Sequence, residues 1–197
     1  MNTQINSGSA FSNEFMSHAE TCILEPPDIC LDNHIMDLKF SPNANVIALG
    51  EVTGHIRIYS YNDKETKEQL TFDFHTESCR AIEFSPDGSL IYTGSADKSM
   101  AVITNGSMAG RILEAHPCPI HTICHLEDNN IIASGDDDGM IRIWDLRQAA
   151  GGKKHAIIME FAEHEGSIAQ MDYRKDLNQI VSASCDGMLG VFDLRKK

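Results

Sequence analysis

The sequence predicts an all-β fold, a β-propeller of which about four blades are present. The first observation is an internal repeat in which an aromatic residue or a histidine is followed, thirteen positions later, by a turn residue. The four pairs are Phe40 and Thr53, Phe84 and Asp97, His125 and Asp138, and Tyr173 and Asp186. The turn positions are 44, 41 and 48 residues apart. A period of this size, with several short strands in each unit, is typical of propeller blades.

The second observation is a histidine that stands 22 positions before the turn aspartate in three of the units. The pairs are His75 with Asp97, His116 with Asp138, and His164 with Asp186. The first unit has Leu31 at the corresponding place. Since each unit of such an array buries its faces only against its neighbours, function is expected on the surface of the array.

Composition sets limits on function. An apolar content of 42% in 197 residues is enough for a packed interior. The net charge of −13 argues against binding to a phosphate backbone and suits basic protein partners. Six cysteines occur without a C-x-x-C pair, so we expect reduced thiols inside the cell. Because no run of 18 apolar residues occurs, we expect no transmembrane helix.

The chain divides into a tail and a repeat array. Residues 1–27 are polar and aperiodic, and they contain too little apolar surface to offset the entropy of ordering, so they are predicted to be disordered. The propeller segment is predicted over residues 28–197, with blades at about 28–74, 75–114, 115–162 and 163–197.

Each unit contains an alternating strand, a small-residue strand and a β-branched strand, which are separated by polar turns. The first strands are predicted at 36–40, 79–84, 122–125 and 168–173, the second at 46–50, 90–94, 131–135 and 180–183, and the third at 56–59, 100–103, 141–144 and 189–192. A weaker outer strand is predicted at 70–74, 111–114 and 156–161. Small residues on the second strands permit close approach of neighbouring backbones.

One stretch carries a family resemblance. Residues 134–145 read Ser-Gly-Asp-Asp-Asp-Gly-Met-Ile-Arg-Ile-Trp-Asp, which resembles the signature of the WD-repeat family. The resemblance implies a hydrogen-bonded structural tetrad that ties the elements of a blade together. Its members would be His116, Ser134, Asp138 and Trp144.

The other units match this signature only in part. The resemblance implies partial tetrads of His75, Thr93 and Asp97, with Ile103 in the tryptophan place, and of His164, Ser182 and Asp186, with Phe192 in that place. The first unit retains only Tyr59 of the four. These departures weaken the tetrads and leave the apolar framework intact.

A recurring set of serine, histidine and aspartate also invites a hydrolase reading, because nucleophilic catalysis needs a base oriented by a third group. An active site is normally assembled once, whereas these residues recur at fixed spacing, which marks a unit of architecture. We therefore predict no catalytic residue.

Two stretches resemble metal sites. Asp136 and Asp138 before Gly139 match part of a calcium loop, but Ser134 holds the first ligand position and no glutamate closes the loop. A second group has the ligand types that zinc prefers, but alternation along a strand scatters its members. That group is His116, Cys118, His121, Cys124 and His125. No metal or cofactor is expected.

Short charged motifs leave two alternatives open. The basic runs 153–154 and 195–197 could contact RNA or serve in nuclear import, although each is short enough for a solvated loop or end. No sequence-specific binding to nucleic acid is expected. The stretch Trp144, Asp145, Leu146 and Arg147 resembles the box by which some WD-repeat proteins dock to the adaptor of cullin-type ubiquitin ligases, and residues 192–195 repeat its form. A substrate receptor is therefore the alternative function.

The amino-acid sequences of several loops and strands favour one subfamily. Residues 48–61, 79–85, 134–139 and 164–171 resemble consecutive blades of a nucleolar WD-repeat subfamily that acts in ribosomal RNA production and large-subunit assembly. The resemblance implies a non-enzymatic protein-interaction scaffold whose partners are pre-ribosomal assembly factors. It also implies a location in the nucleus and nucleolus, with the cytoplasm as a second location.

The end of the chain departs from that family pattern, in which propellers usually close with seven blades. Lys197 follows directly after the third strand of the fourth unit. An open stack of four blades would expose an apolar blade face at each end. We therefore expect a fragment, a truncated product or a chain completed by another copy.

Overall fold

The computed structural model describes residues 28–151 and 156–195, and the predicted tail at 1–27 lies outside the described residues. The described chain forms four antiparallel sheets and one short 3-10 helix, η2 (Leu146–Gly151). The all-β propeller prediction is confirmed. Each sheet falls within one of the predicted blade ranges.

Within each sheet, neighbouring strands are consecutive in the sequence, and the first strand is innermost. The first sheet contains β1 (Ile35–Phe40), β2 (Val46–Glu51), β3 (Ile56–Tyr61) and β4 (Thr66–Phe72). The second contains β5 (Cys79–Phe84), β6 (Leu90–Ser95), β7 (Met100–Thr104) and β8 (Ser107–Ile112). The third contains β9 (Ile120–His125), β10 (Ile131–Asp136), β11 (Ile141–Asp145) and β12 (Ile157–Phe161), and the fourth contains β13 (Ile168–Arg174), β14 (Gln179–Ser184) and β15 (Leu189–Asp193).

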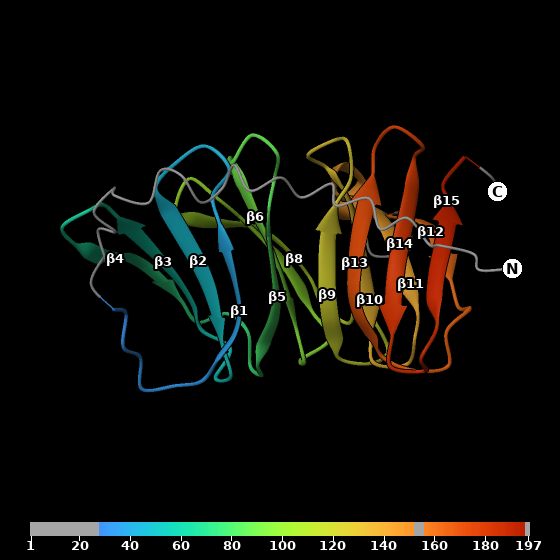
Figure 1. Ribbon diagram of the computed structural model, residues 1–197, viewed down its shortest axis with the longest axis horizontal. Helices are drawn as coiled ribbons and strands as arrows, with labels where there is room; N and C mark the ends of the chain where they lie inside the picture. The colour runs from blue at the N-terminus through green and yellow to red at the C-terminus, as the bar shows by residue number, and fades with distance from the viewer. Residues whose placement is uncertain (1–27, 152–155, 196–197) are drawn as a thin grey trace, which may run out of the picture.

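The sheets follow one another along the long axis of the molecule, as Figure 1 shows. The innermost strands β1, β5, β9 and β13 contact one another in sequence order, so they form the wall of a shared inner surface. The strands outside them splay apart toward the rim. This arrangement places the loops between strands at the two edges of the array.

Two outer strands begin earlier than the sequence predicts, at Thr66 and Ser107 in place of residues 70 and 111. The turn before β8 has positive φ at both Asn105 (48°) and Gly106 (72°), which is the conformation of the tightest hairpins. Before β4, the side chain of Asn62 accepts hydrogen bonds from two backbone N–H groups of the turn. Outer strands are largely exposed, so they lack the apolar alternation on which the prediction relied.

Neighbouring sheets approach each other closely at a glycine of the second strand. A Cβ atom added to Gly94 would lie 2.7 Å from Cγ2 of Ile120, and one added to Gly135 would lie 2.7 Å from Cβ of Ile168. Gly50 has the same relation to Cys79, with 2.6 Å to the carbonyl oxygen. Each glycine therefore makes room for the start of the next sheet's innermost strand.

Apolar side chains fill the three interfaces between sheets, with one buried cluster in each. Trp144 and Tyr92, both fully buried, dominate the interface between the second and third sheets. The tilted rings of Phe161 and Phe192 pack with centroids 4.7 Å apart between the third and fourth sheets. The core is thus a series of layers, as expected for a repeat array.

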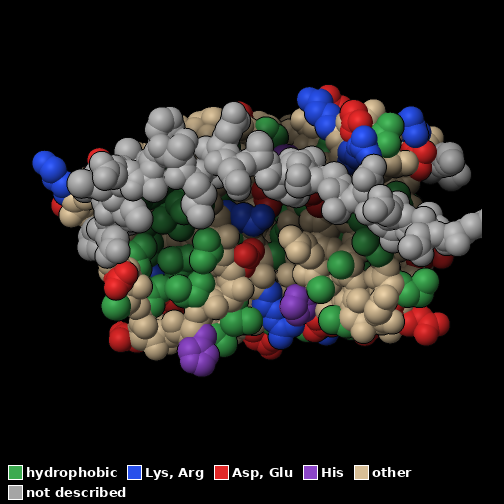
Figure 2. All heavy atoms as spheres, viewed as in Figure 1, with side chains coloured by type: hydrophobic (Ala, Val, Ile, Leu, Met, Phe, Trp, Pro, Cys, Tyr) green, Lys and Arg blue, Asp and Glu red, His purple; other side chains and the backbone are tan. Residues whose placement is uncertain are grey.

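The predicted apolar faces at the two ends of the stack are present among the described residues. On β1, Leu38 and Phe40 are 51% and 59% exposed, and on β15 Leu189 and Val191 are 67% and 60% exposed. Figure 2 shows hydrophobic side chains gathered at the end of the molecule that contains β1 to β3.

The close approach at Gly135 can be tested by Gly135→Ala. The added methyl group would overlap Ile168, so we expect the free energy of unfolding to fall by about 1–3 kcal/mol in urea denaturation. Gly110→Ala on β8 is the matched control, because a Cβ there would meet nothing within 4 Å, and it should leave stability unchanged or higher. Equal losses in the two variants would contradict the packing argument.

Candidate functional site

The third sheet holds a buried histidine with hydrogen bonds on both ring nitrogens. Nε2 of His116 lies 2.7 Å from Oγ of Ser134, and Nδ1 lies 2.9 Å from Oδ2 of Asp136. The indole N–H of Trp144 donates to the same Ser134 oxygen at 2.7 Å. The structure therefore brings together three of the four predicted tetrad members, and Asp136 supplies the carboxylate.

Asp138, the carboxylate predicted for this place, instead accepts a hydrogen bond from the thiol of Cys118 and lies in the exposed turn. The difference arises at Asp136, two residues before Asp138, because the second and fourth units have serine at the corresponding place. Asp136 has a longer side chain there, is fully buried at the end of β10 and reaches His116. Its other oxygen accepts the N–H groups of Asp138 and Met140 and so also holds the hairpin.

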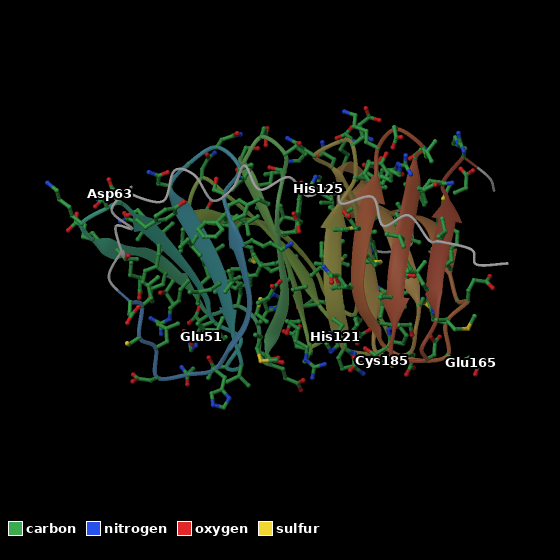
Figure 3. All side chains as sticks on the ribbon, in the orientation of Figure 1. Glu51, Asp63, His121, His125, Glu165 and Cys185 are labelled. Atoms are coloured by element: carbon green, nitrogen blue, oxygen red, sulfur yellow. The ribbon has the colours of Figure 1, made fainter. Side chains whose placement is uncertain are left out.

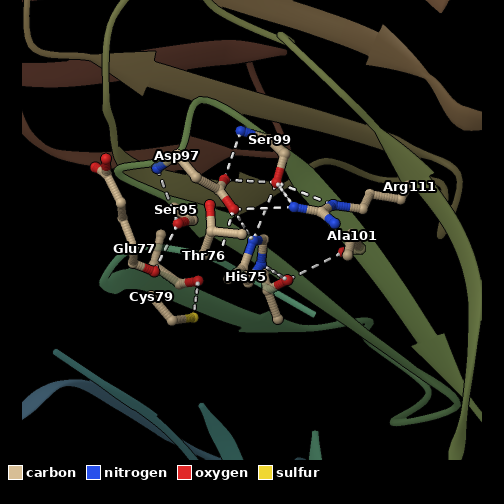
Figure 4. A network of polar contacts seen from close by, with 11 residues as sticks. His75, Thr76, Glu77, Cys79, Ser95, Asp97, Ser99, Ala101 and Arg111 are labelled. Carbon is tan, nitrogen blue, oxygen red and sulfur yellow. Dashed lines mark hydrogen bonds and ion pairs between the residues drawn. The ribbon is translucent and has the colours of Figure 1, made fainter. Parts of the chain in front are cut away.

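In the second sheet, His75 contacts Thr93 and Asp97, with Nε2 2.9 Å from Oγ1 of Thr93 and Nδ1 3.2 Å from Oδ2 of Asp97. Figure 4 shows this network. Arg111 from β8 adds an ion pair of 2.9 Å to the same oxygen of Asp97 and donates to Ser99. The sequence analysis missed Arg111 and Ser99, since neither belongs to the family pattern.

In the fourth sheet, Nε2 of His164 lies 2.7 Å from Oγ of Ser182, and Nδ1 lies 3.0 Å from Oδ2 of Asp186. Phe192 takes the tryptophan place and meets the histidine ring edge-on, with centroids 6.2 Å apart. Gly190 leaves room for this contact, because a Cβ there would lie 2.7 Å from the phenylalanine ring and from Oγ of Ser182.

The first sheet has an ion-pair network in place of a histidine unit. Glu51 is fully buried, accepts from Nε of Arg57 at 2.5 Å and also accepts from Asn33 and Thr53. Arg57 also bonds to Glu68. Burial by itself would raise the pKa of Glu51, but the hydrogen bonds from Arg57 and Asn33 outweigh it and lower the pKa. The hydroxyl of Tyr59 donates to Glu68 at 2.9 Å.

The histidines of the three units and their serine or threonine partners are buried inside the array, with exposures of 1% for His116 and 0% for Ser134. Burial lowers the pKa of His75 although the neighbouring Asp97 acts to raise it, so a neutral ring is favoured. A nucleophile needs access to its substrate, which Ser134 in this environment lacks. The arrangement is suited to joining strands and sheets.

Of the five histidine and cysteine residues at 116–125, the three histidines and Cys118 have separate polar partners, and Cys124 is buried. His125 lies 3.2 Å from Glu83, and His121 lies 3.8 Å from Asp137, at the places labelled in Figure 3. The hydrogen bond to Asp138 raises the pKa of Cys118 to about 11, and burial raises that of Cys124 to about 12, so both thiols stay protonated. Within 28–151 and 156–195, no group of three or more His, Cys, Asp or Glu residues could hold a metal ion.

The residues of the docking box already have intramolecular partners. Trp144 is fully buried, while Asp145 accepts from Nε of Arg147 at 2.8 Å and from its terminal nitrogen at 3.0 Å. Asp193 and Arg195 form the same fork in the fourth sheet. The Arg147 side chain is 55% exposed, and it is the member of the box that a partner can reach. Of the basic runs, 153–154 and 196–197 lie outside the described residues.

The inner surface, formed by the innermost strands, is polar and linked across sheets. Lys39 on β1 lies 3.0 Å from Glu83 on β5, and Arg80 on β5 lies 3.2 Å from Asp137, beyond β10. Asp137 also accepts from Ser167 at 3.0 Å and so connects three successive sheets.

No helix in the described part of the chain has both the length and the hydropathy of a membrane span.

Comparison with known proteins agrees with this architecture. Residues 66–103 and 109–145 match the family described as WD domain, G-beta repeat. In a crystal structure, Sqt1 of Chaetomium thermophilum resembles this chain with a TM-score of 0.71 at 21% identity, over 82% of this chain and 44% of that one. That likeness shows the fold. The chain therefore contains WD repeats and has the fold of a WD-repeat propeller.

Curated relatives are more specific, and they are named WD repeat-containing protein 55. The proteins of Rattus norvegicus and Homo sapiens are each 37% identical over 150 residues, which are 74% of this chain and 37% of the relative. The homolog in Drosophila melanogaster is 36% identical over 148 residues, 74% of this chain and 28% of the relative. The chain thus spans about a third of the length of these relatives.

The assignment of the buried carboxylate can be tested by comparing Asp136→Asn with Asp138→Asn. Loss of a buried charged hydrogen-bond partner of His116 should lower the free energy of unfolding by about 1.5–3 kcal/mol in Asp136→Asn. The exposed Asp138→Asn variant should stay within about 0.5 kcal/mol of wild type. Urea denaturation measures both, and a larger loss at Asp138 would reverse the assignment.

The pH dependence of the second unit follows from Asp97. Burial acts to raise its pKa, but hydrogen bonds from Ser99 and the N–H of Thr76 outweigh burial and lower the pKa from 3.8 to about 2. The carboxylate therefore stabilises the fold fully above pH 3.8, and this contribution is lost as the pH falls toward 2.

We expect the stability difference between wild type and Asp97→Asn to shrink over that window in urea titrations at stepped pH. Asp63→Asn, on an exposed turn labelled in Figure 3, is the control and should show a small difference at every pH. A difference for Asp97→Asn that grew on acidification would contradict the sign.

Proposed function

We propose that this chain is a non-enzymatic protein-interaction scaffold that acts in ribosomal RNA production and ribosome biogenesis, in the nucleus and nucleolus, with a cytoplasmic pool. The observation that carries the scaffold role is the repetition of one buried structural unit through successive sheets. The serine, histidine and aspartate groups serve the joints of the array, and the surfaces between and around them are left for partners.

The ribosomal part of the proposal rests on the subfamily resemblance of residues 48–61 and 164–171 and on charge. The relatives named WD repeat-containing protein 55 match over 74% of the chain. A net charge of −13 suits association with basic proteins, and ribosomal assembly factors work among many of these. Pre-ribosomal assembly factors are therefore the proposed partners.

A substrate receptor of a cullin-type ubiquitin ligase is the second candidate. The observation in its favour is the exposed guanidinium of Arg147, which Asp145 orients by a two-point contact. The burial of Trp144 weighs against direct use of the whole box. The two candidates differ in the partner that each requires.

The first experiment is affinity purification of the endogenous protein at physiological salt, with mass spectrometry of the co-purified proteins. Recovery of pre-ribosomal proteins and large-subunit precursors is the expected result. A cullin adaptor recovered without ribosomal factors would overturn the ribosomal proposal and favour the receptor.

Arg147→Ala separates the two candidates directly. For a scaffold in ribosome assembly, we expect unchanged co-purification of pre-ribosomal proteins and a stability change within about 0.5 kcal/mol, because surface ion pairs contribute little. Arg195→Ala, which breaks the same fork in the fourth sheet, is the matched control. Specific loss of a cullin adaptor in Arg147→Ala alone would support the receptor.

A further inference from the structure

The second and third sheets splay apart toward the rim and leave an apolar groove of about 460 Å³. Its walls are the β7 and β8 face of the second sheet and, on the third sheet, β10 with the start of η2. The lining includes Leu90, Val102, Ile112, Ile132 and Leu146. Both walls belong to the described chain, so the groove is a property of two complete neighbouring sheets.

The groove exists because β8 is built from smaller residues than the other outer strands. The strand registers make the comparison direct: Ile58 pairs with Leu70 in the first sheet, Ile143 with Met159 in the third, and Val102 with Gly110 in the second. A Cβ atom on Gly110 would meet nothing within 4 Å. The place that leucine and methionine side chains occupy in the neighbouring sheets is therefore open here.

The next inward-facing position on the outer strand shows the same trend. Phe72 occupies it in the first sheet and Phe161 in the third, whereas the second sheet has Ile112. Between the first and second sheets, where Leu70 and Phe72 line the matching place, the hollow measures about 290 Å³. The larger groove thus follows from Gly110 and Ile112 on β8, which are smaller than the residues at the matching places of the first sheet.

Charge at the groove has one sign. Among the described residues, the charged members of its lining are Arg111 and Arg147, with no carboxylate, in a chain whose net charge is −13. Their partners Asp97, Asp145 and Asp128 lie outside the lining and hold the guanidinium groups in place. A guanidinium presents five donors, and Arg111 uses Nε and Nη2 for Asp97 and Ser99, so its Nη1 retains capacity for a further carboxylate.

The free edge of β8 adds a backbone surface to this groove. β8 is the outermost strand of its sheet, and its residues 107–110 are exposed and uncharged. By contrast, the exposed run of β4 includes Lys67 and Glu68, which are the kind of charges that protect an edge from pairing. An extended chain can therefore pair with β8 while its side chains enter the groove.

We propose that this groove binds an extended segment of a partner protein in which apolar side chains alternate with carboxylates. One apolar side chain fills the space beside Gly110, and the neighbouring carboxylate, which points to the other face of the added strand, contacts Arg111. The proposal deepens the scaffold function and rests on it, since it assigns a surface and a chemistry to one class of its partners.

The test is titration of the purified chain with a synthetic peptide of alternating leucine and aspartate, followed by amide resonances in NMR spectra. Perturbations should concentrate on β8 and η2. Gly110→Leu should occupy the groove and weaken binding by about tenfold or more, since a leucine side chain of the peptide would lose the space in which it buries its apolar surface. Because nothing lies within 4 Å of the added Cβ, the variant should fold, which its thermal unfolding verifies.

Matched controls define the chemistry. Gln69→Leu adds the same side chain to the exposed outer strand of the first sheet, outside the groove, and should leave binding unchanged. Peptides of alternating leucine and lysine, or serine and aspartate, should bind more weakly than the leucine and aspartate peptide. Absence of binding, equal binding to Gly110→Leu, or equal binding of either control peptide would overturn the proposal.

This titration uses no ribosomal component, so its failure would leave the scaffold function standing. Conversely, affinity purification without pre-ribosomal proteins would refute the ribosomal role and leave the peptide result unaffected. The two proposals can therefore fail separately.

Discussion

The stack depends on burying one histidine in each joint between neighbouring sheets without leaving a ring nitrogen unpaired. His75, His116 and His164 each follow the outer strand of one sheet. Each bonds to the second strand of the next sheet. In a low-dielectric interior an unpaired ring nitrogen is costly, so the serine or threonine and the carboxylate must both be in place. The loop that carries each histidine is thereby fixed to the following sheet. Where the histidine is missing, in the first sheet, the buried Glu51 and Arg57 hold the hairpin instead.

Close backbone approach completes each joint. Gly50, Gly94 and Gly135 admit the first residue of the next inner strand, which brings successive inner strands into one polar surface. Because the sheets touch at the inside and splay at the rim, the outer strands decide how well each gap is filled. Leu70 and Phe72 fill the gap between the first and second sheets more fully, and Gly110 leaves the gap between the second and third sheets open. Small differences within a repeat thus produce a distinctive groove.

This architecture explains why residues that resemble a catalytic set have a structural role. Their recurrence, burial and mutual hydrogen bonds all serve the joints of the array. We therefore expect partners to bind at the rim, the edges and the inner surface, where charge and local shape vary from sheet to sheet. The chain is acidic overall, whereas its groove is lined by arginine residues. A scaffold that binds several partners needs surfaces that differ in charge in this way.

The sequence by itself determined the fold class, the repeat, the inner three strands of each unit and the identity of the buried histidines, because these follow from fixed spacing and from alternation on half-buried strands. Outer strands were placed less well, since an exposed edge strand carries no apolar pattern. Only the tertiary structure decided that Asp136 and not Asp138 meets His116, because that choice depends on side-chain reach across a hairpin. Only the structure paired Arg111 with Asp97 and opened the groove beside Gly110, since both depend on strand register and on how neighbouring sheets splay.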